Sequence, residues 1–186
     1  MRIELTKEQI LKRRRISGGL EPLRADYTIE LTDGIDVNTI LLTELRNWYL
    51  DLLANGDRRL LATENLASAV TLVAMDGGLG IEVPDNCRRM FDIRLNGWNH
   101  AVAIHPSDEF ERIKAMQQNP FTAATANNPV AVFLPGNMGG KTADIAVWPG
   151  SSGISLAVGV VDPGENLYIM DEMALTTMPS GTVLLD

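Results

Sequence analysis

The sequence predicts an α+β protein: an N-terminal helical pair packed on an antiparallel β-sheet or small sandwich, with one inserted helix. Three observations predict this class. Apolar residues recur at helical spacing in the first third of the chain, short β-branched segments dominate from residue 76 onward, and Gly, Pro and Ser separate these segments. At 186 residues the chain can bury a core without metals or disulfides, so we expect a single domain over residues 1–186.

Residues 1–75 are expected to be mainly helical, and a short helix comes first. Thr6 and Gln9 have the spacing of a capping box, which begins a helix at this point. Gly18 and Gly19 end it, because glycine suits the backbone conformation that closes a helix. The alternating segment Tyr27–Leu31 is interpreted as a short strand or as the approach to the next helix.

A longer helix is predicted over Asp33–Ala54, with a stop at Asn55-Gly56. Its apolar stripe consists of residues spaced by three or four: Leu41, Leu45, Trp48 and Leu52, widened by Leu42, Tyr49 and Leu53. Residues 57–75 are expected to begin as a second helix antiparallel to this one. They are expected to end as a strand, because Ala69–Met75 is apolar and β-branched.

Residues 76–165 are expected to be rich in strands. The predicted strands are Gly80–Val83, Arg89–Leu95, Ala101–Ile104, Val130–Leu134, Asp144–Trp148 and Leu156–Val161. Gly97 marks a hairpin between the second and third of them. The inserted helix is predicted over Asp108–Gln118, with Ser107 as its cap. Residues 166–186 combine a Met-rich segment with a turn and are expected to form a flexible tail.

The chain is acidic, with a net charge of −8. This charge argues against a general nucleic-acid-binding surface, because phosphate contacts require clustered Lys and Arg. The one dense basic run, Lys12–Arg15, is interpreted as a solvated helix end or as a contact with DNA or an acidic partner.

The sequence predicts an intracellular protein that does not enter a membrane. The N-terminus has no signal-peptide pattern, and no apolar segment approaches the length of a membrane span. The single cysteine, Cys87, rules out an internal disulfide and fits a reducing compartment.

The segment Pro135–Thr142 follows an apolar strand and ends in Gly-Lys-Thr, as a phosphate-binding loop does. The motif requires glycine at the position that Pro135 occupies, and Gly136 is one residue too close. A strand pattern that ends at Pro149, rather than a long helix, follows Thr142. The segment is therefore interpreted as a hairpin loop, and a nucleotide-dependent enzyme ranks last among the functions considered.

Other potential catalytic groups also lack the necessary spacing. His100 and His105 lie at opposite ends of a predicted strand and are expected to face different sides. Gly150–Gly153 is not a nucleophile elbow, and the adjacent carboxylates of Asp171 and Glu172 diverge. We therefore predict no catalytic residue, no cofactor and no metal, and a protein that is not an enzyme.

The candidate interface residues are two tryptophans and three arginines: Trp98, Trp148, Arg88, Arg89 and Arg94. Each tryptophan ends a predicted strand beside Gly or Pro, a position that suits either sheet packing or an interface anchor. The arginines lie close to these strands, where they can pair with a partner's carboxylates.

The order of several short segments resembles a known family. These segments follow the helical pair and are Ile81–Arg89, Leu95–Trp98, Gln117–Pro120, Asn128–Val132 and Ile145–Pro149. In this order the chain is similar to neck proteins of tailed bacteriophages. It more closely resembles the head-to-tail adaptor, or tail tubular (gatekeeper), proteins of short-tailed phages and prophages, over residues 36–161.

The resemblance implies a structural protein that joins portal to tail as a ring of identical subunits. In such adaptors helices dock on the portal protein and a β-domain meets the tail tube, so portal and tail proteins are the expected partners. The acidic charge suits a channel through which DNA passes without being specifically bound. The expected location is the cytoplasm of the bacterial host before assembly and the virion neck afterwards.

The alternative function is a cytoplasmic, non-enzymatic binding module with a small ligand or a protein partner. This alternative predicts a closed apolar pocket near Trp98 and Trp148.

Overall fold

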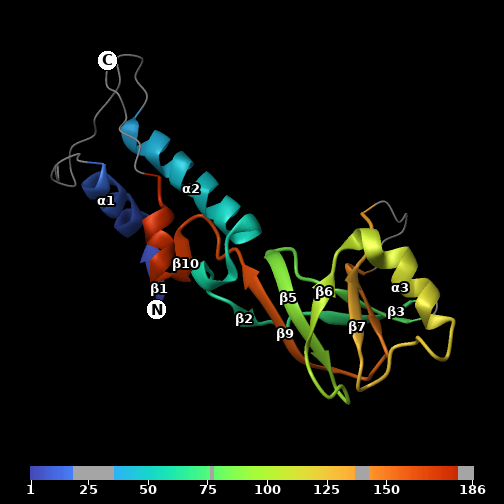
Figure 1. Ribbon diagram of the computed structural model, residues 1–186. Coiled ribbons are helices and arrows are strands. Elements are labelled where there is room, and N and C mark those ends of the chain that lie inside the picture. Colours follow the sequence, from blue (N-terminus) through green and yellow to red (C-terminus); the bar gives the residue numbers. More distant parts are fainter. Residues whose placement is uncertain (19–35, 76–77, 137–142, 180–186) are drawn as a thin grey trace. The chain divides into compact units, whose positions relative to one another are not determined.

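The computed structural model describes residues 1–18, 36–75, 78–136 and 143–179 (Figure 1). They belong to two units: unit 1 is Met1–Ala62 with Asp162–Asp186, and unit 2 is Thr63–Val161. Each unit contains both helix and strand, which confirms the predicted α+β class. The chain is thus divided near residues 62 and 161, whereas the sequence suggested one domain with changes of character near residues 75 and 165.

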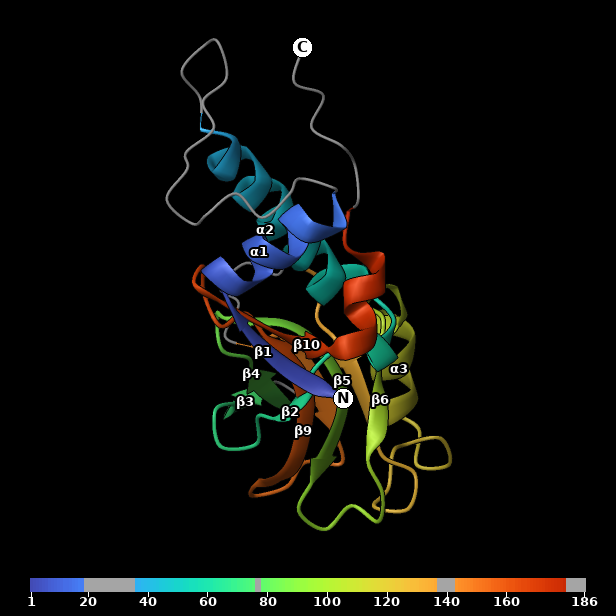
Figure 2. The ribbon, with the colours of Figure 1, turned by 90° about the vertical axis from the view of Figure 1, so that its left-hand side faces the viewer.

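Unit 1 is built from the two ends of the chain. Its elements are β1 (Arg2–Thr6), α1 (Lys7–Ser17), α2 (Val37–Asn55), the 3-10 helices η1 (Arg58–Leu60) and η3 (Glu172–Thr177), and β10 (Leu167–Asp171). β1 and β10 pair antiparallel, from Arg2 opposite Asp171 to Thr6 opposite Leu167 (Figure 2). α1 contacts α2 and both strands, so α1 and α2 form the helical pair of this unit.

The first helix, α1, begins where the sequence predicts, and it runs to Ser17, two residues past the expected end at Arg15. The N–H of Thr6 donates to Gln9 Oε1 at 2.9 Å, and the N–H of Gln9 donates to Thr6 Oγ1 at 3.4 Å. These two bonds form the capping box. At the other end, the N–H of Gly18 donates to the carbonyl of Arg14 at 3.0 Å.

The second helix, α2, begins after Asp36, whose carboxylate accepts from the N–H of Asn38 at 3.0 Å. The predicted first residue, Asp33, lies outside the described residues. The buried residues of α2 form one stripe: Val37, Leu41, Leu45, Tyr49, Leu52 and Leu53. Tyr49 and Leu53, which were expected to widen the stripe, are buried, whereas Trp48 and Leu42 are only half-buried.

The expectation of a helix after residue 57 is wrong. The chain forms only η1 there, and then the short strand β2 (Glu64–Asn65). The side-chain oxygen of Asn65 accepts from the N–H groups of Ala67 at 3.1 Å and Ala157 at 3.0 Å. Such bonds compete with helical hydrogen bonds, and here they tie the chain to a neighbouring strand. The strand expected at the end of this segment is confirmed as β3 (Thr71–Met75).

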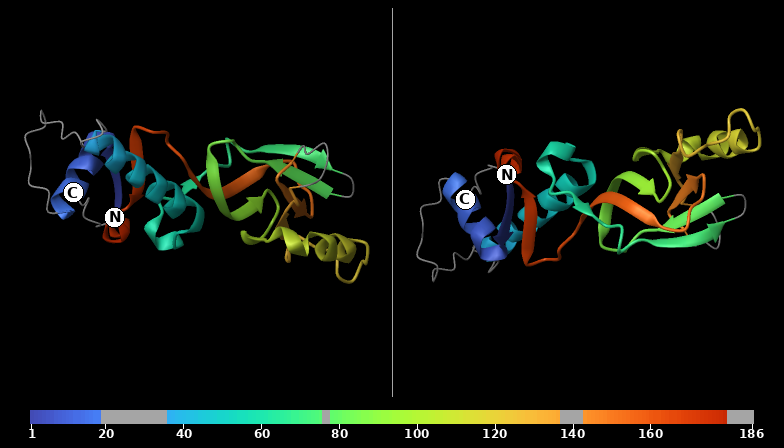
Figure 3. Two further views of the ribbon diagram at one scale, coloured as in Figure 1. Left: turned by 90° about the horizontal axis from the view of Figure 1, so that it is seen from above. Right: turned by 90° about the horizontal axis from the view of Figure 1, so that it is seen from below.

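The described residues of unit 2 form a curled sheet of eight strands (Figure 3). Its strands are β2, β3, β4 (Gly78–Glu82), β5 (Cys87–Leu95), β6 (Val102–His105), β7 (Val130–Phe133), β8 (Ile145–Trp148) and β9 (Ile154–Val161). Their order is β2-β9-β5-β6-β7-β8-β4-β3, and β6 and β7 form a parallel pair in an otherwise antiparallel sheet. All six strands predicted after residue 76 are confirmed, with small shifts at their ends.

The inserted helix predicted from the sequence is α3 (Phe110–Gln117), which follows the 3-10 helix η2 (Ser107–Glu109). It connects β6 to β7, because two parallel strands cannot be joined by a tight hairpin. The prediction that Ser107 caps this helix is wrong. Pro106 is the residue before η2, and no side chain caps either η2 or α3. Glu109, the residue before α3, already has a helical backbone conformation.

Strands β7 and β8 are buried on both faces, because alternate residues point to opposite sides of a sheet. One face contributes to the main core of unit 2 through Ala131, Ile145 and Val147. The other face packs against α3 through Val132, Ala146 and Trp148. The antiparallel pairing of β7 with β8 confirms the predicted hairpin, although loop residues 137–142 lie outside the described residues.

The segment expected to be a flexible tail is instead part of unit 1 as far as it is described. It forms β10 and η3, and the side chains of Tyr168 and Met170 are fully buried. The strand considered at Tyr27–Leu31 lies outside the described residues. In the described part of the chain, no helix is both long and apolar enough to cross a membrane.

Candidate interaction surfaces

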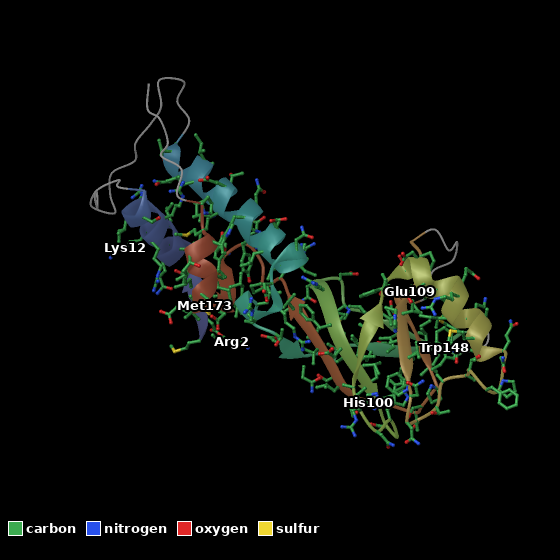
Figure 4. The ribbon with its side chains drawn as sticks, viewed as in Figure 1. Arg2, Lys12, His100, Glu109, Trp148 and Met173 are labelled. Atoms are coloured by element: carbon green, nitrogen blue, oxygen red, sulfur yellow. The ribbon has the colours of Figure 1, made fainter. Side chains whose placement is uncertain are left out.

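Both candidate tryptophans lie in the interior of unit 2. Trp98 is 2% exposed and its Nε1 donates to the carbonyl of Pro149 at 3.0 Å. Trp148 is 8% exposed and lies between the sheet and α3 (Figure 4). The sequence allowed two roles for these tryptophans, sheet packing or an interface anchor. Because both indoles are buried, their role in the isolated chain is sheet packing.

The three candidate arginines separate into two places on β5. Arg88 and Arg89 lie at the start of the strand, where the guanidinium carbon of Arg89 lies 4.8 Å from the centre of the Phe91 ring. Arg94 lies at the other end, and its Nε donates to the carbonyl of Trp98 at 3.1 Å. Arg88 and Arg89 therefore lie together, whereas Arg94 lies apart from them and stabilises the turn between β5 and β6.

Arg88 and Arg89 line a hollow of about 320 Å³ in unit 2, which we call the β5 hollow. Its lining is Val83, Pro84, Asp85, Cys87, Arg88, Arg89, Met90, Phe133, Leu134 and Asp144. Asp144 Oδ2 accepts from the N–H of Val83 at 2.9 Å, which fixes one wall. Burial raises the pKa of the Cys87 thiol, so this cysteine is mainly protonated near neutral pH.

A second hollow, of about 260 Å³, lies in unit 1 beside α2. Its lining is Lys7, Thr39, Leu42, Thr43, Arg46, Asn47, Glu165 and Tyr168. The charge of Arg46 is already engaged: its Nη2 lies 2.6 Å from Asp162 Oδ2, and its Nη1 donates to the carbonyl of Gly164 at 3.1 Å. This arginine therefore holds the backbone between β9 and β10.

The basic run of α1 is only partly solvated. Arg14 is 1% exposed, and its Nη2 lies 3.0 Å from Glu44 Oε2 on α2. Arg15 donates to the side chain of Asn38, also on α2. Lys12 points away from the helix (Figure 4). The interpretation of Arg14 as part of a solvated helix end is therefore wrong. Its side chain is buried, and its acidic partner, Glu44, belongs to the same chain.

Large apolar side chains are exposed on both units. In unit 2, Phe121 is 97% exposed just after α3. In unit 1, Met1 is 81% and Met173 is 61% exposed. The chain segments that carry these two residues are adjacent, because the amino group of Met1 lies 2.7 Å from Asp171 Oδ2. Phe121 was not among the residues that the sequence indicated.

The histidines do not converge on a site. His105 Nδ1 lies 3.4 Å from Glu109 Oε2, and Glu109 also pairs with Arg112, whose hydrogen bond lowers the pKa of that carboxyl. Figure 4 shows His100 on a separate part of unit 2. Within the described residues, no group of three or more His, Cys, Asp or Glu side chains could hold a metal ion.

Neither a protein-family model nor a curated protein matches the chain. The features that bear on function are therefore the exposed apolar side chains and the two hollows.

Proposed function

We propose that this protein is a structural component of a bacteriophage or prophage neck, in which identical copies form a ring that joins the portal to the tail. The observation that carries the proposal is the exposure of large apolar side chains on each of two separately packed units. Phe121 is 97% exposed on unit 2 and Met173 is 61% exposed on unit 1. Aromatic residues and methionine are enriched at surfaces that contact other proteins.

Two units with separate exposed surfaces suit a protein that joins two different partners. Unit 1 supplies the helical pair, which the family resemblance assigns to the portal. Unit 2 supplies the β-domain, which the resemblance assigns to the tail. The net charge of −8 also supports the proposal, because an acidic wall repels the DNA that must pass through a neck.

The proposal is tested by mixing the purified chain with the portal ring and the tail protein of the genome that encodes it. Size-exclusion chromatography and electron microscopy should show the chain bound as a ring at one end of the portal. Met173→Ser should weaken portal binding about tenfold, because it removes an exposed apolar contact. Thr176→Ser is the matched control, because the new hydroxyl can still donate to the Met173 carbonyl as Thr176 does at 2.7 Å. Failure to bind both the portal and the tail protein would overturn the proposal.

The alternative, a cytoplasmic binding module with a small ligand, would use a hollow rather than an exposed side chain. The β5 hollow and the hollow beside α2 are lined by residues other than Trp98 and Trp148. A thermal-shift screen of small metabolites separates the two functions: a ligand that raises the melting temperature without any portal binding would favour the alternative.

A further inference from the structure

We propose that Phe121 of one copy inserts into the β5 hollow of the next copy, so that identical chains associate head to tail. The ring in which this contact would operate rests on the proposed function. The contact itself rests on unit 2 alone, which carries both the protruding ring and the hollow.

Phe121 is held out into solvent by an ordered turn. Its N–H donates to Asn119 Oδ1 at 3.0 Å, and the N–H of Ala123 donates to the Asn119 carbonyl at 2.8 Å. Thr122 Oγ1 donates to the carbonyl of Met116 at 2.8 Å, which closes the turn onto α3. Because the backbone that carries the Phe121 ring is already ordered, little backbone freedom is lost when the ring binds. The turn therefore presents Phe121 in a form ready to enter a partner.

The β5 hollow is large enough to admit a phenyl ring and offers it both apolar and cationic side chains. Its volume of about 320 Å³ exceeds that of a cavity of roughly 150 Å³, which already binds benzene. Its apolar lining comes from Val83, Pro84, Met90, Phe133 and Leu134. Arg88 and Arg89 add two cations, and cations are attracted to the electron-rich face of an aromatic ring. Arg89 already lies against one ring, that of Phe91, at 4.8 Å.

Phe121 and the β5 hollow lie at opposite ends of the sheet. The hollow is formed by the first residues of β5 and the last residues of β7. The segment after α3 lies at the other end of β5, where the N–H of Asn99 donates to the carbonyl of Ala126 at 3.0 Å. The nine residues of β5 separate these ends by roughly 25 Å. A chain therefore cannot fill its own hollow, and the contact must join two copies.

A contact of this kind is heterologous, because each copy uses one surface to give and a different surface to receive. Such contacts produce closed rings when the rotation between copies allows it and open chains when it does not. One phenylalanine buries about 150–250 Å². Stable interfaces bury about 800 Å² on each partner, so we expect weak association in solution that a larger assembly strengthens.

The test uses Cys87, which lines the hollow and is the only cysteine of the chain. In the variant Pro120→Cys, which keeps Phe121 and places a thiol on the exposed residue beside it, a short bismaleimide should join the new thiol of one copy to Cys87 of the next. The reaction is run at mildly alkaline pH, because burial raises the pKa of the Cys87 thiol. A ladder of dimers, trimers and larger products is expected, since each copy then carries one thiol at each end of the contact.

Three further variants identify the contact. Adding Cys87→Ser to Pro120→Cys should leave at most dimers joined through residue 120. Adding Phe121→Ala to Pro120→Cys should reduce the ladder at least tenfold, because it removes the ring that enters the hollow. Adding Arg88→Ala to Pro120→Cys should slow cross-linking about two- to fivefold, because it removes one cation from the hollow.

The outcomes separate this inference from the proposed function. Failure of Pro120→Cys to give a ladder that depends on both Cys87 and Phe121, at the highest concentration the protein reaches, would overturn the head-to-tail contact. If the chain still binds the portal, the proposed function stands without this contact. If the ladder forms and neither portal nor tail protein binds, the contact stands and the neck function fails. If Phe121→Ala abolishes tail binding and no ladder forms, a tail protein rather than a second copy covers Phe121, which also overturns the inference.

Discussion

The hydroxyl of Tyr49 donates a hydrogen bond to the carbonyl of Ile169 and accepts one from the N–H of the same residue, each at 3.0 Å. A side chain of α2 thereby satisfies both backbone groups of one residue of β10. The Tyr49 ring also packs against Tyr168, with the ring centres 4.9 Å apart. This pair of bonds joins an early helix to a strand near the end of the chain and stabilises unit 1.

Tyr49→Phe should lower the free energy of unfolding by about 1–3 kcal/mol, because it leaves the N–H and carbonyl of Ile169 without this partner. Urea denaturation followed by circular dichroism measures the change. Hydrogen exchange should also speed up in the peptide that contains β10. Tyr168→Phe is the matched control, since it removes a neighbouring hydroxyl and keeps both Ile169 bonds. Equal losses in the two variants would contradict the assigned role.

The stability that Tyr49 contributes should be lost at high pH. Burial raises the pKa of Tyr49 to about 12, above its ordinary value. The folded protein thus holds this proton more tightly than the unfolded chain does. The contribution is fully present below about pH 10 and declines as the pH rises towards about 12. The stability difference between the native protein and Tyr49→Phe should therefore shrink over this range in urea titrations. A difference that stays constant up to pH 12 would contradict the prediction.

The ion pair between Arg46 and Asp162 should matter more than an exposed pair. The two side chains are 20% and 5% exposed, and their closest atoms lie 2.6 Å apart. Arg46→Met would leave a buried carboxylate without this guanidinium and should cost about 3 kcal/mol in unfolding free energy. Arg2→Met is the control, because Arg2 and Glu4 are 46% and 59% exposed, and such pairs contribute at most about 1 kcal/mol. Similar costs for both variants in urea denaturation would contradict the assigned difference.

The elements with local signals were predictable from the sequence. The capping box of Thr6 and Gln9 needs only neighbouring residues, so it predicted the start of α1 correctly. The strands of unit 2 were found because β-branched runs between Gly and Pro favour strands in almost any context. Their pairing order was not predicted, because it depends on contacts between distant parts of the chain.

The missed features all depend on distant partners. Residues 166–171 contain only the short apolar run Leu167–Met170, which does not by itself specify a partner, but they become a strand because β1 pairs with them. Arg14 reads as one more charge at a helix end, yet Glu44 lies 3.0 Å from it across the helical pair. The segment after residue 57 has helical spacing, but Asn65 bonds to Ala157 of β9 instead. In each case a tertiary contact overrides the local pattern.

The structure brings together only some of the candidate residues. Arg88 and Arg89 both line the β5 hollow at a place where the register of β5 against β9 is irregular, between Cys87 and Arg89, whereas Arg94 is separated from them by the length of β5. Trp98 and Trp148 were chosen because tryptophan is common at interfaces, but their strand-end positions lie under other elements. Exposure is a property of the folded molecule, and this is why Phe121 was not identified from the sequence.

The close approach of β5 to β9 should make Gly159 intolerant of any side chain. A Cβ at this position would lie 2.9 Å from the carbonyl oxygen of Arg89 and 2.7 Å from Met90 Sδ. Because the backbone of a paired strand cannot easily move, Gly159→Ala should lower the unfolding free energy by about 1–3 kcal/mol. Gly150→Ala is the matched control, since its Cβ would meet Leu79 at an ordinary 3.6 Å and should change stability by less than about 0.5 kcal/mol. Urea denaturation of both variants measures the contrast, and a Gly159→Ala protein as stable as Gly150→Ala would show that β5 and β9 are less tightly packed than the structure describes.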